Sequence, residues 1–247
     1  MDGVLLLDKP LDCSSNGILQ KIKRLLGAKK AGHTGSLDPL ATGMLPICLG
    51  KATRLSGHFL GADKAYTFTL CLGVTSTTGD REGELTQQVA DLAPFTLEAL
   101  EAAVTQLTGA IMQIPPMYSA LKRQGVPLYK LARKGETVER EPRPVQIYQL
   151  KILSYEHPFV RLQSLVSKGT YIRVLAEDLG AALGCGAYVT TLHRDYVTPF
   201  DTAKMYDLET LLAIQATQGT AGLEACLLSI PTVVAQLQAM PPVDSVS

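Results

Sequence analysis

The segment that most constrains how this chain can fold is AGHTGSLDPLATGMLPICLG, residues 31–50. Its glycines and proline residues interrupt any helix, and its apolar residues are too numerous for an ordinary solvated loop. The segment places one carboxylate, Asp38, directly before Pro39, which biases Asp38 toward an extended or turn conformation. Because the apolar run 44–49 follows at once, we expect Asp38 to lie at the edge of the core, where water is partly excluded.

A carboxylate in a partly dry position needs a cation, since its pKa otherwise rises and the charge is lost. Arg173, at the start of a predicted helix, is the candidate, because a bidentate guanidinium would keep Asp38 ionised and oriented. His33 is the nearest candidate general base. An Asp-Pro pair in a glycine-rich loop is more often a simple turn, and a lone histidine beside a turn is more often structural. These residues alone therefore favour a turn over a catalytic site.

The rest of the chain mixes strand and helix patterns without strict β–α–β alternation, which favours an α+β fold. Alternation of apolar residues over 66–72 predicts a strand. Helical spacing predicts a helix that follows Ser14 or Ser15 and stops at Gly27, and another over about 172–183. The remaining expected elements are strands at 3–7, 145–154, 159–167 and 187–192, a polar loop over 73–83, a helix from Thr96 to about Leu107, and one more helix in the acidic tail after about Thr202.

Composition excludes several classes of protein. Of 247 residues, 46% are apolar, which suits a folded core rather than a disordered chain. The five cysteines are scattered with no pair at metal-binding spacing, so we interpret them as reduced residues of a cytoplasmic protein without a metal site. No basic leader is present at the N-terminus, and no stretch approaches the ~20 apolar residues of a membrane span. Motifs for nucleotide hydrolysis or a serine nucleophile are absent from the sequence.

Charge is unevenly distributed although the net charge is zero. Residues 1–54 hold eight Lys/Arg against four Asp/Glu, and residues 122–143 hold seven against three, whereas residues 77–121 and 200–247 are acidic. A basic face can capture a phosphate backbone, although charge alone more often marks a solvated face. The second basic block belongs to residues 113–144, whose prolines and tyrosines predict an excursion from the core that could contact a partner.

Six blocks occur along the chain in this order: GVLLLDKP with SSN (3–16), AGHTGSLDPLATGMLPICLGKAT (31–53), DKAYTF (63–68), QIPPMYSALKRQGVPLYKLAR (113–133), SKGTYIRVLAEDLG (167–180) and LGCGAYVTTLHR (183–194). Together they resemble the bacterial TruB-type tRNA pseudouridine-55 synthases over about residues 3–206. The resemblance implies the α+β pseudouridine synthase fold, with a mixed, mainly antiparallel sheet flanked by helices, and it implies that residues 113–144 are a basic, thumb-like insertion.

The resemblance also implies roles for individual residues. Asp38 matches the family's catalytic aspartate, Arg173 its ion-pair partner, and Tyr66 the tyrosine that stacks on the target base and is a candidate for proton transfer. His33 matches the histidine that packs against flipped-out bases, and Tyr171 and Leu192 match residues lining the uridine pocket. The loop-supporting residues are Lys9 and Pro10, and the expected contacts to the RNA backbone are Lys122, Arg123, Lys130, Arg133 and Lys134.

The implied reaction breaks the N1–C1′ bond of uridine, rotates the base and joins C5 to C1′. No redox step or group donor is needed, so the resemblance implies no cofactor and no metal. The carboxylate could add to C6 of the base or attack or deprotonate the ribose, and the sequence leaves these routes open. The uridine must first leave its stack, at a cost of a few kcal/mol. The implied partner is the T-arm stem-loop of tRNA, bound by a monomeric enzyme.

The chain departs from the family pattern in two places. Asp12 and Cys13 stand where the family usually has a glycine-containing pair. We expect residues 1–230 to form the catalytic domain and 231–247 a tail, with no room for the family's PUA-like RNA-binding domain; weaker tRNA binding by an intact core would follow. Two alternatives stay open: a synthase of the guide-RNA-dependent branch, and a tRNA-folding chaperone or binding module.

Overall fold

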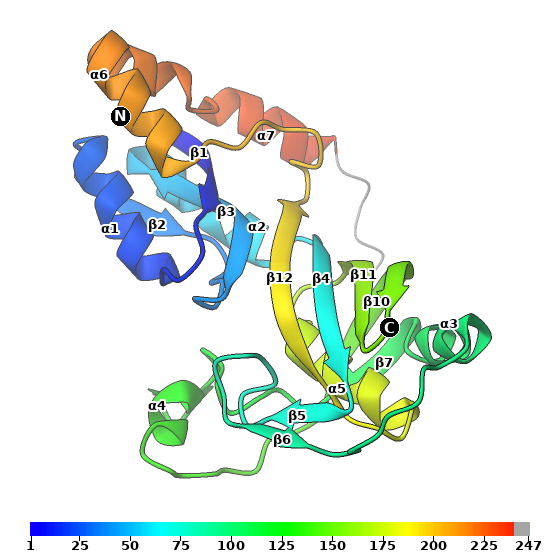
Figure 1. The fold of residues 1–247 in the computed structure, drawn as a ribbon. Coiled ribbons are helices and arrows are strands. Elements are labelled where there is room, and N and C mark those ends of the chain that lie inside the picture. Colours follow the sequence, from blue (N-terminus) through cyan, green and yellow to red (C-terminus); the bar gives the residue numbers. More distant parts are fainter. Residues whose placement is uncertain (240–247) are drawn as a thin grey trace. The chain divides into compact units, whose positions relative to one another are not determined.

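The computed structural model describes residues 1–239, which fall into two compact units. The first unit contains Met1–Ala65 and the chain from His193 onward, and the second contains Tyr66–Leu192. The boundary between them falls inside two strands, β4 (Lys64–Leu72) and β12 (Ala187–Val197) (Figure 1).

The first unit is built on β1 (Gly3–Lys9) and β3 (Ala41–Leu49), which pair antiparallel from Gly3↔Leu49 to Lys9↔Gly43. The strand β2 (Ala31–His33) also pairs antiparallel with β3, and β12 neighbours β3 in the sheet. Every residue of 4–7 and 43–49 is buried, so these strands form the centre of the unit's core.

Helix α1 (Ser15–Leu25) begins and ends where its sequence predicts. The hydroxyl of Ser14 accepts a hydrogen bond from the Gly17 amide at 3.0 Å, which caps the N-terminus. Gly27 has φ of 56°, the left-handed conformation that terminates helices. Short helical segments η1 (Gly50–Leu55) and α2 (Ser56–Leu60) follow β3.

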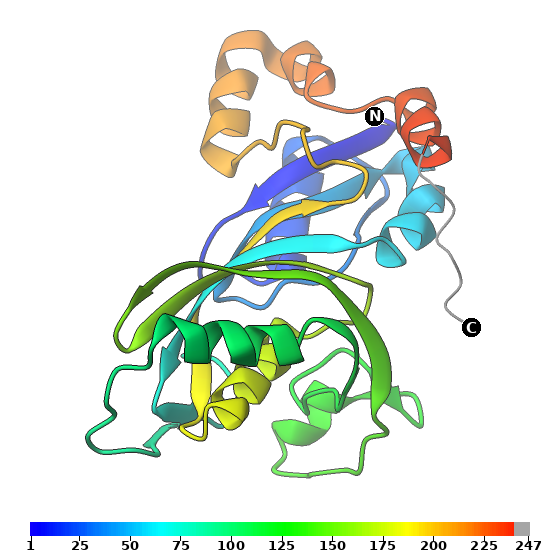
Figure 2. The ribbon, with the colours of Figure 1, turned by 90° about the vertical axis from the view of Figure 1, so that its right-hand side faces the viewer.

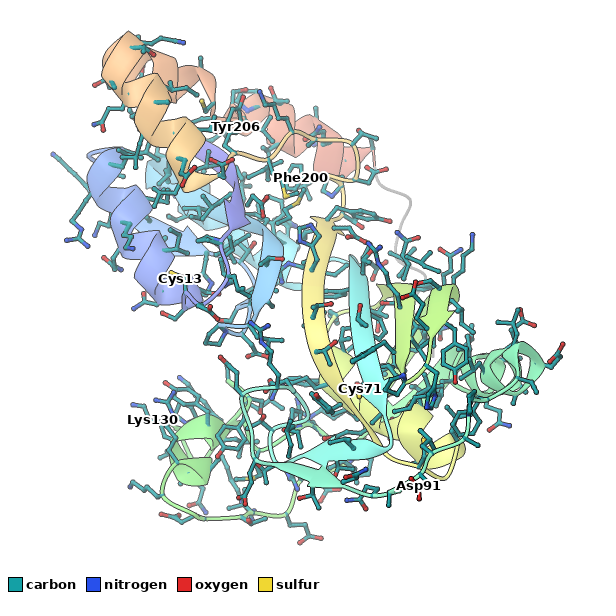
Figure 3. All side chains as sticks on the ribbon, in the orientation of Figure 1. Cys13, Cys71, Asp91, Lys130, Phe200 and Tyr206 are labelled. Carbon is teal, nitrogen blue, oxygen red and sulfur yellow. The ribbon has the colours of Figure 1, made fainter. Side chains whose placement is uncertain are left out.

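The C-terminal part of the first unit differs from the single helix and the tail that the sequence predicted. It contains two helices, α6 (Leu208–Ala225) and α7 (Ile230–Gln238), and both contact β1 (Figure 1). Val233 of α7 is fully buried and clusters with Val4, Phe59 and Phe200, which is labelled in Figure 3. The predicted boundary at 230/231 therefore falls within α7, a helix too short for its apolar spacing to stand out. Residues 240–247 of the predicted tail lie outside the described residues.

In the second unit the strand order is β12, β4, β11 (Phe159–Val166), β10 (Arg143–Glu156) and β7 (Gly109–Gln113). The pairs β10–β11 and β10–β7 are antiparallel. Helix α3 (Leu97–Gln106), capped by Thr96 as predicted, packs against β10 and against α5 (Ile172–Ala182) (Figure 2). The predicted α+β architecture, an antiparallel-rich sheet flanked by helices, is confirmed.

Two small hairpins complete the second unit. Part of the expected loop 73–83 is the strand β5 (Val74–Ser76), which pairs with β6 (Leu85–Gln87). Residues 113–144, hereafter the insertion, leave the sheet at the end of β7 and return at the start of β10. The insertion contains β8 (Lys122–Arg123), β9 (Val126–Pro127) and α4 (Leu128–Ala132).

Candidate active site

Asp38 lies in the connection between β2 and β3; residues 34–44, which comprise this connection and the first residues of β3, are hereafter the Asp38 loop. The residue is half-buried between Leu37, which is 6% exposed, and Leu40, which is 1% exposed. This is the edge-of-core position that the sequence predicted. The buried hydroxyl of Ser15, on α1, accepts a hydrogen bond from the Leu37 amide at 2.8 Å and donates to the Leu37 carbonyl at 2.9 Å. The residue preceding Asp38 is therefore tied to α1.

Arg194, on β12, holds the Asp38 loop at both ends, and sequence reasoning missed it. Its side chain is buried, with the residue 1% exposed; Nε donates to the carbonyl of Met44 at 2.7 Å and Nη2 to that of Gly35 at 2.9 Å. Gly43 has φ of 98°, and a Cβ there would lie 2.3 Å from the Arg194 carbonyl oxygen. Only glycine fits at this position. The one signal available in the sequence was the arginine that ends the LGCGAYVTTLHR block.

Lys9, predicted to support the loop, is fully buried at the end of β1. Its ammonium group donates to the carbonyls of Cys13 at 2.6 Å and Pro10 at 2.8 Å, and it lies 3.4 Å from that of Pro39, the residue after Asp38. The Asp12 amide also donates to the Pro39 carbonyl, at 2.9 Å. Asp12 has φ of 55°, a conformation that favours glycine, which explains physically why a glycine-containing pair suits this turn.

His33 lies on β2, one residue before the Asp38 loop, and is half-buried. Burial lowers the pKa of its imidazole, and the positive charge of Arg194 lowers it further. Within residues 1–239, its buried Nδ1 has no hydrogen-bond partner. A neutral imidazole with an unused ring nitrogen can accept a proton or a hydrogen bond from a bound group.

The second unit supplies the other predicted residues. Tyr66 on β4 is 8% exposed and Leu192 on β12 is 7% exposed. Tyr171 precedes α5 and is half-buried; its backbone amide donates to Oε1 of the buried Gln113 at 3.0 Å, and the Gln113 side chain donates back to the Tyr171 carbonyl at 3.3 Å. This reciprocal pair fixes the start of α5, and with it the backbone that leads into Arg173.

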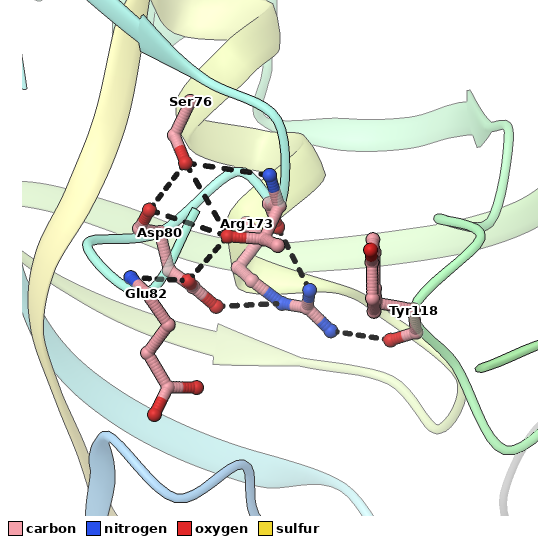
Figure 4. Close-up of polar contacts among 6 residues, drawn as sticks. Ser76, Asp80, Glu82, Tyr118 and Arg173 are labelled. Carbon is pink, nitrogen blue, oxygen red and sulfur yellow. Dashed lines mark hydrogen bonds and ion pairs between the residues drawn. The ribbon is translucent and has the colours of Figure 1, made fainter. Parts of the chain in front are cut away.

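Arg173, which is buried like its ion-pair partner Asp80, is the centre of a polar cluster (Figure 4). Its Nη1 and Nη2 donate to the carbonyls of Thr78 at 2.8 Å and Tyr118 at 2.7 Å, and its Nε lies 3.7 Å from the Asp80 carboxylate. Asp80 in turn accepts hydrogen bonds from the Thr78 hydroxyl at 2.6 Å and the Glu82 amide at 3.0 Å. Sequence reasoning missed Asp80, because one acid in the polar run GVTSTTGDREG carries no distinguishing signal. The predicted pair of Arg173 with Asp38 joins the two units and stays a prediction.

The cations predicted to contact RNA backbone are all exposed on the insertion. Figure 3 labels Lys130 on α4. The guanidinium of Arg133 lies 5.6 Å from the ring centroid of Tyr129, and Nη1 of Arg123 donates to the Glu139 carbonyl at 3.0 Å. An exposed group of positive charges of this kind suits a polyanion. The cationic side chains concerned are those of Lys122, Arg123, Lys130, Arg133 and Lys134.

Within the described part of the chain, no group of three or more His, Cys, Asp or Glu residues is arranged to hold a metal ion. No helix among residues 1–239 is both long and apolar enough to cross a membrane. All five cysteines are free thiols.

The model of the TruB family pseudouridylate synthase N-terminal domain matches residues 23–172, and that of the tRNA pseudouridylate synthase B C-terminal domain matches residues 173–235. Among curated relatives, tRNA pseudouridine synthase B of Stutzerimonas stutzeri is 54% identical over 227 residues, which cover 92% of this chain and 74% of the relative. The protein of the same name from Haemophilus influenzae is 50% identical over 97% of this chain and 78% of the relative.

Two solved structures resemble the chain more distantly. One, titled "Crystal Structure of a Cbf5-Nop10-Gar1 Complex", has a TM-score of 0.75 and 28% identity, and covers 95% of this chain and 62% of its own. The other, titled "Structure of H/ACA RNP bound to a substrate RNA containing 2'-deoxyuridine", has a TM-score of 0.68 and 27% identity, over 91% of this chain and 56% of its own. The chain thus spans less than two thirds of either solved protein.

Proposed function

This chain belongs to the TruB family of pseudouridylate synthases, and we propose that its substrate is tRNA, in which it isomerises uridine 55 of the T-arm loop to pseudouridine. The observation that carries the proposal is identity of 50 to 54% to proteins named tRNA pseudouridine synthase B, over about three quarters of their length. The reaction keeps every atom of the base except the exchangeable proton: N1–C1′ breaks, C5–C1′ forms, C5 loses a proton and N1 gains one.

Asp38 is the proposed nucleophile. Its carboxylate would add to C6 of the base or act at the ribose, and either route needs an ionised oxygen held in one position. The contacts of Arg194, Lys9 and Ser15 with backbone atoms of the Asp38 loop support such an arrangement, because they fix the main chain on both sides of the carboxylate.

Arg173 is the proposed partner of the Asp38 carboxylate. A guanidinium has five N–H donors in a planar fork and can contact several groups at once; that of Arg173 donates to the carbonyls of Thr78 and Tyr118 and forms an ion pair with Asp80. Because these contacts hold the buried Arg173 side chain on both Nη atoms and Nε, the guanidinium would meet Asp38 in a fixed orientation.

The other residues would hold the extruded uridine. Tyr66 would stack on the base and is the candidate for proton transfer at C5, while His33, Tyr171 and Leu192 would enclose the base and its neighbours. The exposed cations of the insertion would contact the RNA backbone and make binding depend on salt. Pro10, beside the carbonyl bound by Lys9, would support the turn next to the Asp38 loop. We also propose a monomeric, cytoplasmic enzyme that uses neither metal nor cofactor.

The test is incubation of an unmodified tRNA transcript with the protein alone, followed by mapping of pseudouridine. We expect product at position 55. Asp38→Asn should lower turnover by at least about a thousandfold, as loss of a nucleophile does in other enzymes, while tRNA binding persists. Asp201→Asn, which changes an exposed carboxylate of the same unit, is the matched control.

The same assay separates the alternatives. A guide-RNA-dependent synthase would leave the transcript unmodified unless a guide RNA is added. A chaperone or binding module would act on tRNA folding equally well with Asp38→Asn. Product at another position, or turnover that survives Asp38→Asn, would contradict the proposal.

A further inference from the structure

The insertion contains a cavity of about 270 Å³. It lies among β8, the residues that follow β7, and the chain leading into β10. Three of its lining residues are apolar, and the other six are charged. The charged lining residues are Lys122, Arg123, Glu139, Arg140, Glu141 and Arg143.

The lining carries four cations and two carboxylates, an excess of two positive charges. Within residues 1–239, neither carboxylate lies within 4.0 Å of any of the four cationic groups in an ion pair. The four cations share one cavity with two acids without an ion pair to either of them, and Arg140 also interacts electrostatically with Glu177, which does not line the cavity. A cavity of this kind is suited to an anion supplied from outside the chain.

Two of the guanidinium groups are held by neutral acceptors. Arg123 donates through Nη1 to the Glu139 carbonyl, and Arg140 donates through Nη1 to the Pro115 carbonyl at 3.2 Å. These bonds orient the guanidinium groups without cancelling their charge. The Nε of Arg140 is buried and has no hydrogen-bond partner in the described part of the chain. A buried donor of this kind calls for an acceptor oxygen.

We propose that this cavity binds a single phosphate group of the tRNA backbone, an inference that rests on the proposed function. A phosphodiester supplies negative charge and several acceptor oxygens, which match the forked donors of arginine. The ligand would be the backbone and not a base, because the lining offers charge and donors but no aromatic ring for stacking.

The proposal divides the cations of the insertion into two groups. Lys122 and Arg123 line the cavity together with Arg140 and Arg143, two residues to which the sequence assigned no role. Lys130, Arg133 and Lys134 do not line it and provide only diffuse attraction. One RNA phosphate should therefore depend on the cavity cations far more than its neighbours do.

The test uses the full chain and a set of T-arm stem-loop RNAs, each with one neutral methylphosphonate linkage at a successive position. Dissociation constants are measured for the natural protein, Arg143→Gln and Lys122→Gln. Both side chains are exposed, and Arg143 pairs with Gln113 through its backbone, so neither substitution removes a contact that holds the fold. Lys151→Gln, an exposed lysine of β10 outside the cavity, is the matched control.

We expect one linkage whose neutralisation weakens binding to the natural protein and to Lys151→Gln by about tenfold, the effect of losing a charge-assisted hydrogen bond. The same linkage should have little effect on Arg143→Gln or Lys122→Gln, and each of these variants should lower the slope of log K against log salt by about one. An equal penalty at every position, or an undiminished penalty in both cavity variants, would overturn the proposal.

Two further measurements separate the possible sources of the phosphate and the two proposals. The first is the dissociation constant of inorganic phosphate for the natural protein and for Arg143→Gln. If Arg143→Gln weakens phosphate binding while every RNA linkage behaves alike, the cavity binds a free anion and the RNA assignment is overturned. Pseudouridine formation is assayed with the same RNAs and variants. Coupling between one linkage and Arg143 without any pseudouridine would support the cavity proposal and reject the proposed enzymatic function.

Discussion

Cationic side chains are prominent at both the Asp38 loop and the insertion, but their burial and their partners differ between the two regions. In the Asp38 loop, Lys9 and Arg194 are buried, at 0 and 1% exposure, and donate to backbone carbonyls. On the insertion the cations are exposed or line the cavity, where no ion pair among the described residues joins them to Glu139 or Glu141. A buried cation that donates to carbonyls fixes its own main chain, whereas a cation without a counter-ion is available to a polyanionic partner. Substitutions in the first region should therefore change turnover and stability, and those in the second should change binding.

The largest effect expected is that of Arg194→Met. The substitution leaves the carbonyls of Gly35 and Met44 without donors, and each buried unsatisfied group costs about 1–3 kcal/mol. We expect unfolding by denaturant to show a loss in this range for each group, and turnover to fall by about a hundredfold, because small displacements of a reacting group are this costly. The dissociation constant for tRNA should stay within about twofold of the natural value.

Arg24→Met is the control for Arg194→Met, since Arg24 also donates to a carbonyl, that of Gln20, but at the exposed surface. Its effect on stability should stay within about 0.5 kcal/mol. If Arg194→Met lowers stability while turnover is preserved, Arg194 supports the fold of the unit and does not position Asp38.

Lys9→Met should have a smaller effect than Arg194→Met. The substitution removes the donor shared by the carbonyls of Cys13, Pro10 and Pro39, but it also removes a buried charge whose desolvation is costly, so the two effects partly cancel in stability. We expect turnover to fall about tenfold, as the turn beside Asp38 loosens. Steady-state kinetics of Lys9→Met beside Lys21→Met, an exposed lysine of the same unit, measures this difference. Equal kinetics of the two variants would contradict the role of Lys9.

The double variant Lys130→Gln/Lys134→Gln tests the opposite side of the comparison. Loss of two phosphate-directed charges should lower the slope of log K against log salt by about two, and stability should change by less than about 0.5 kcal/mol. Turnover at saturating tRNA should be unchanged, because neither residue contacts the reacting groups. A drop in turnover at saturation would show that the insertion does more than bind. The measurement is a salt titration of binding together with single-turnover kinetics.

Much of the fold could be predicted because its signals are local. The caps formed by Ser14 and Thr96, the stop at Gly27 and the apolar spacing of α5 each depend on a few neighbouring residues. The position of Asp38 at the edge of the core likewise follows from the apolar run directly after it. In these elements the conformation that the local sequence favours is the conformation found in the folded protein.

What could not be predicted depends on contacts between distant residues. Arg194 donates to a carbonyl 150 positions earlier, and Arg173 reaches Thr78 across 95 positions. An isolated arginine at the end of a strand pattern gives no indication of which carbonyl it meets, and Asp80 resembles any acid in a polar loop. The helix α7 has a local cap in Ser229, but its apolar spacing is too short to stand out, and Val233 packs on β1, which is distant in the sequence.

The smallest effect concerns the pKa of His33, and it tests whether the charge of Arg194 acts on side chains beside the Asp38 loop as well as on its backbone. Burial, and next the charge of Arg194, lowers the pKa of His33 below 6.5. Below pH 6.5 the unfolded chain takes up a proton that folded His33 does not bind until the pH reaches its lower pKa. The free energy of unfolding should therefore decrease as the pH is lowered across this interval, by at most about 1.4 kcal/mol per pH unit. His33→Asn should remove this contribution, whereas His58→Asn, at an exposed position, should not. Arg194→Met should reduce it only in part, since burial is the larger cause. Denaturant unfolding between pH 5 and 8 measures all four proteins, and identical slopes in the natural protein and His33→Asn would mean that the buried cations of this region act on the backbone alone.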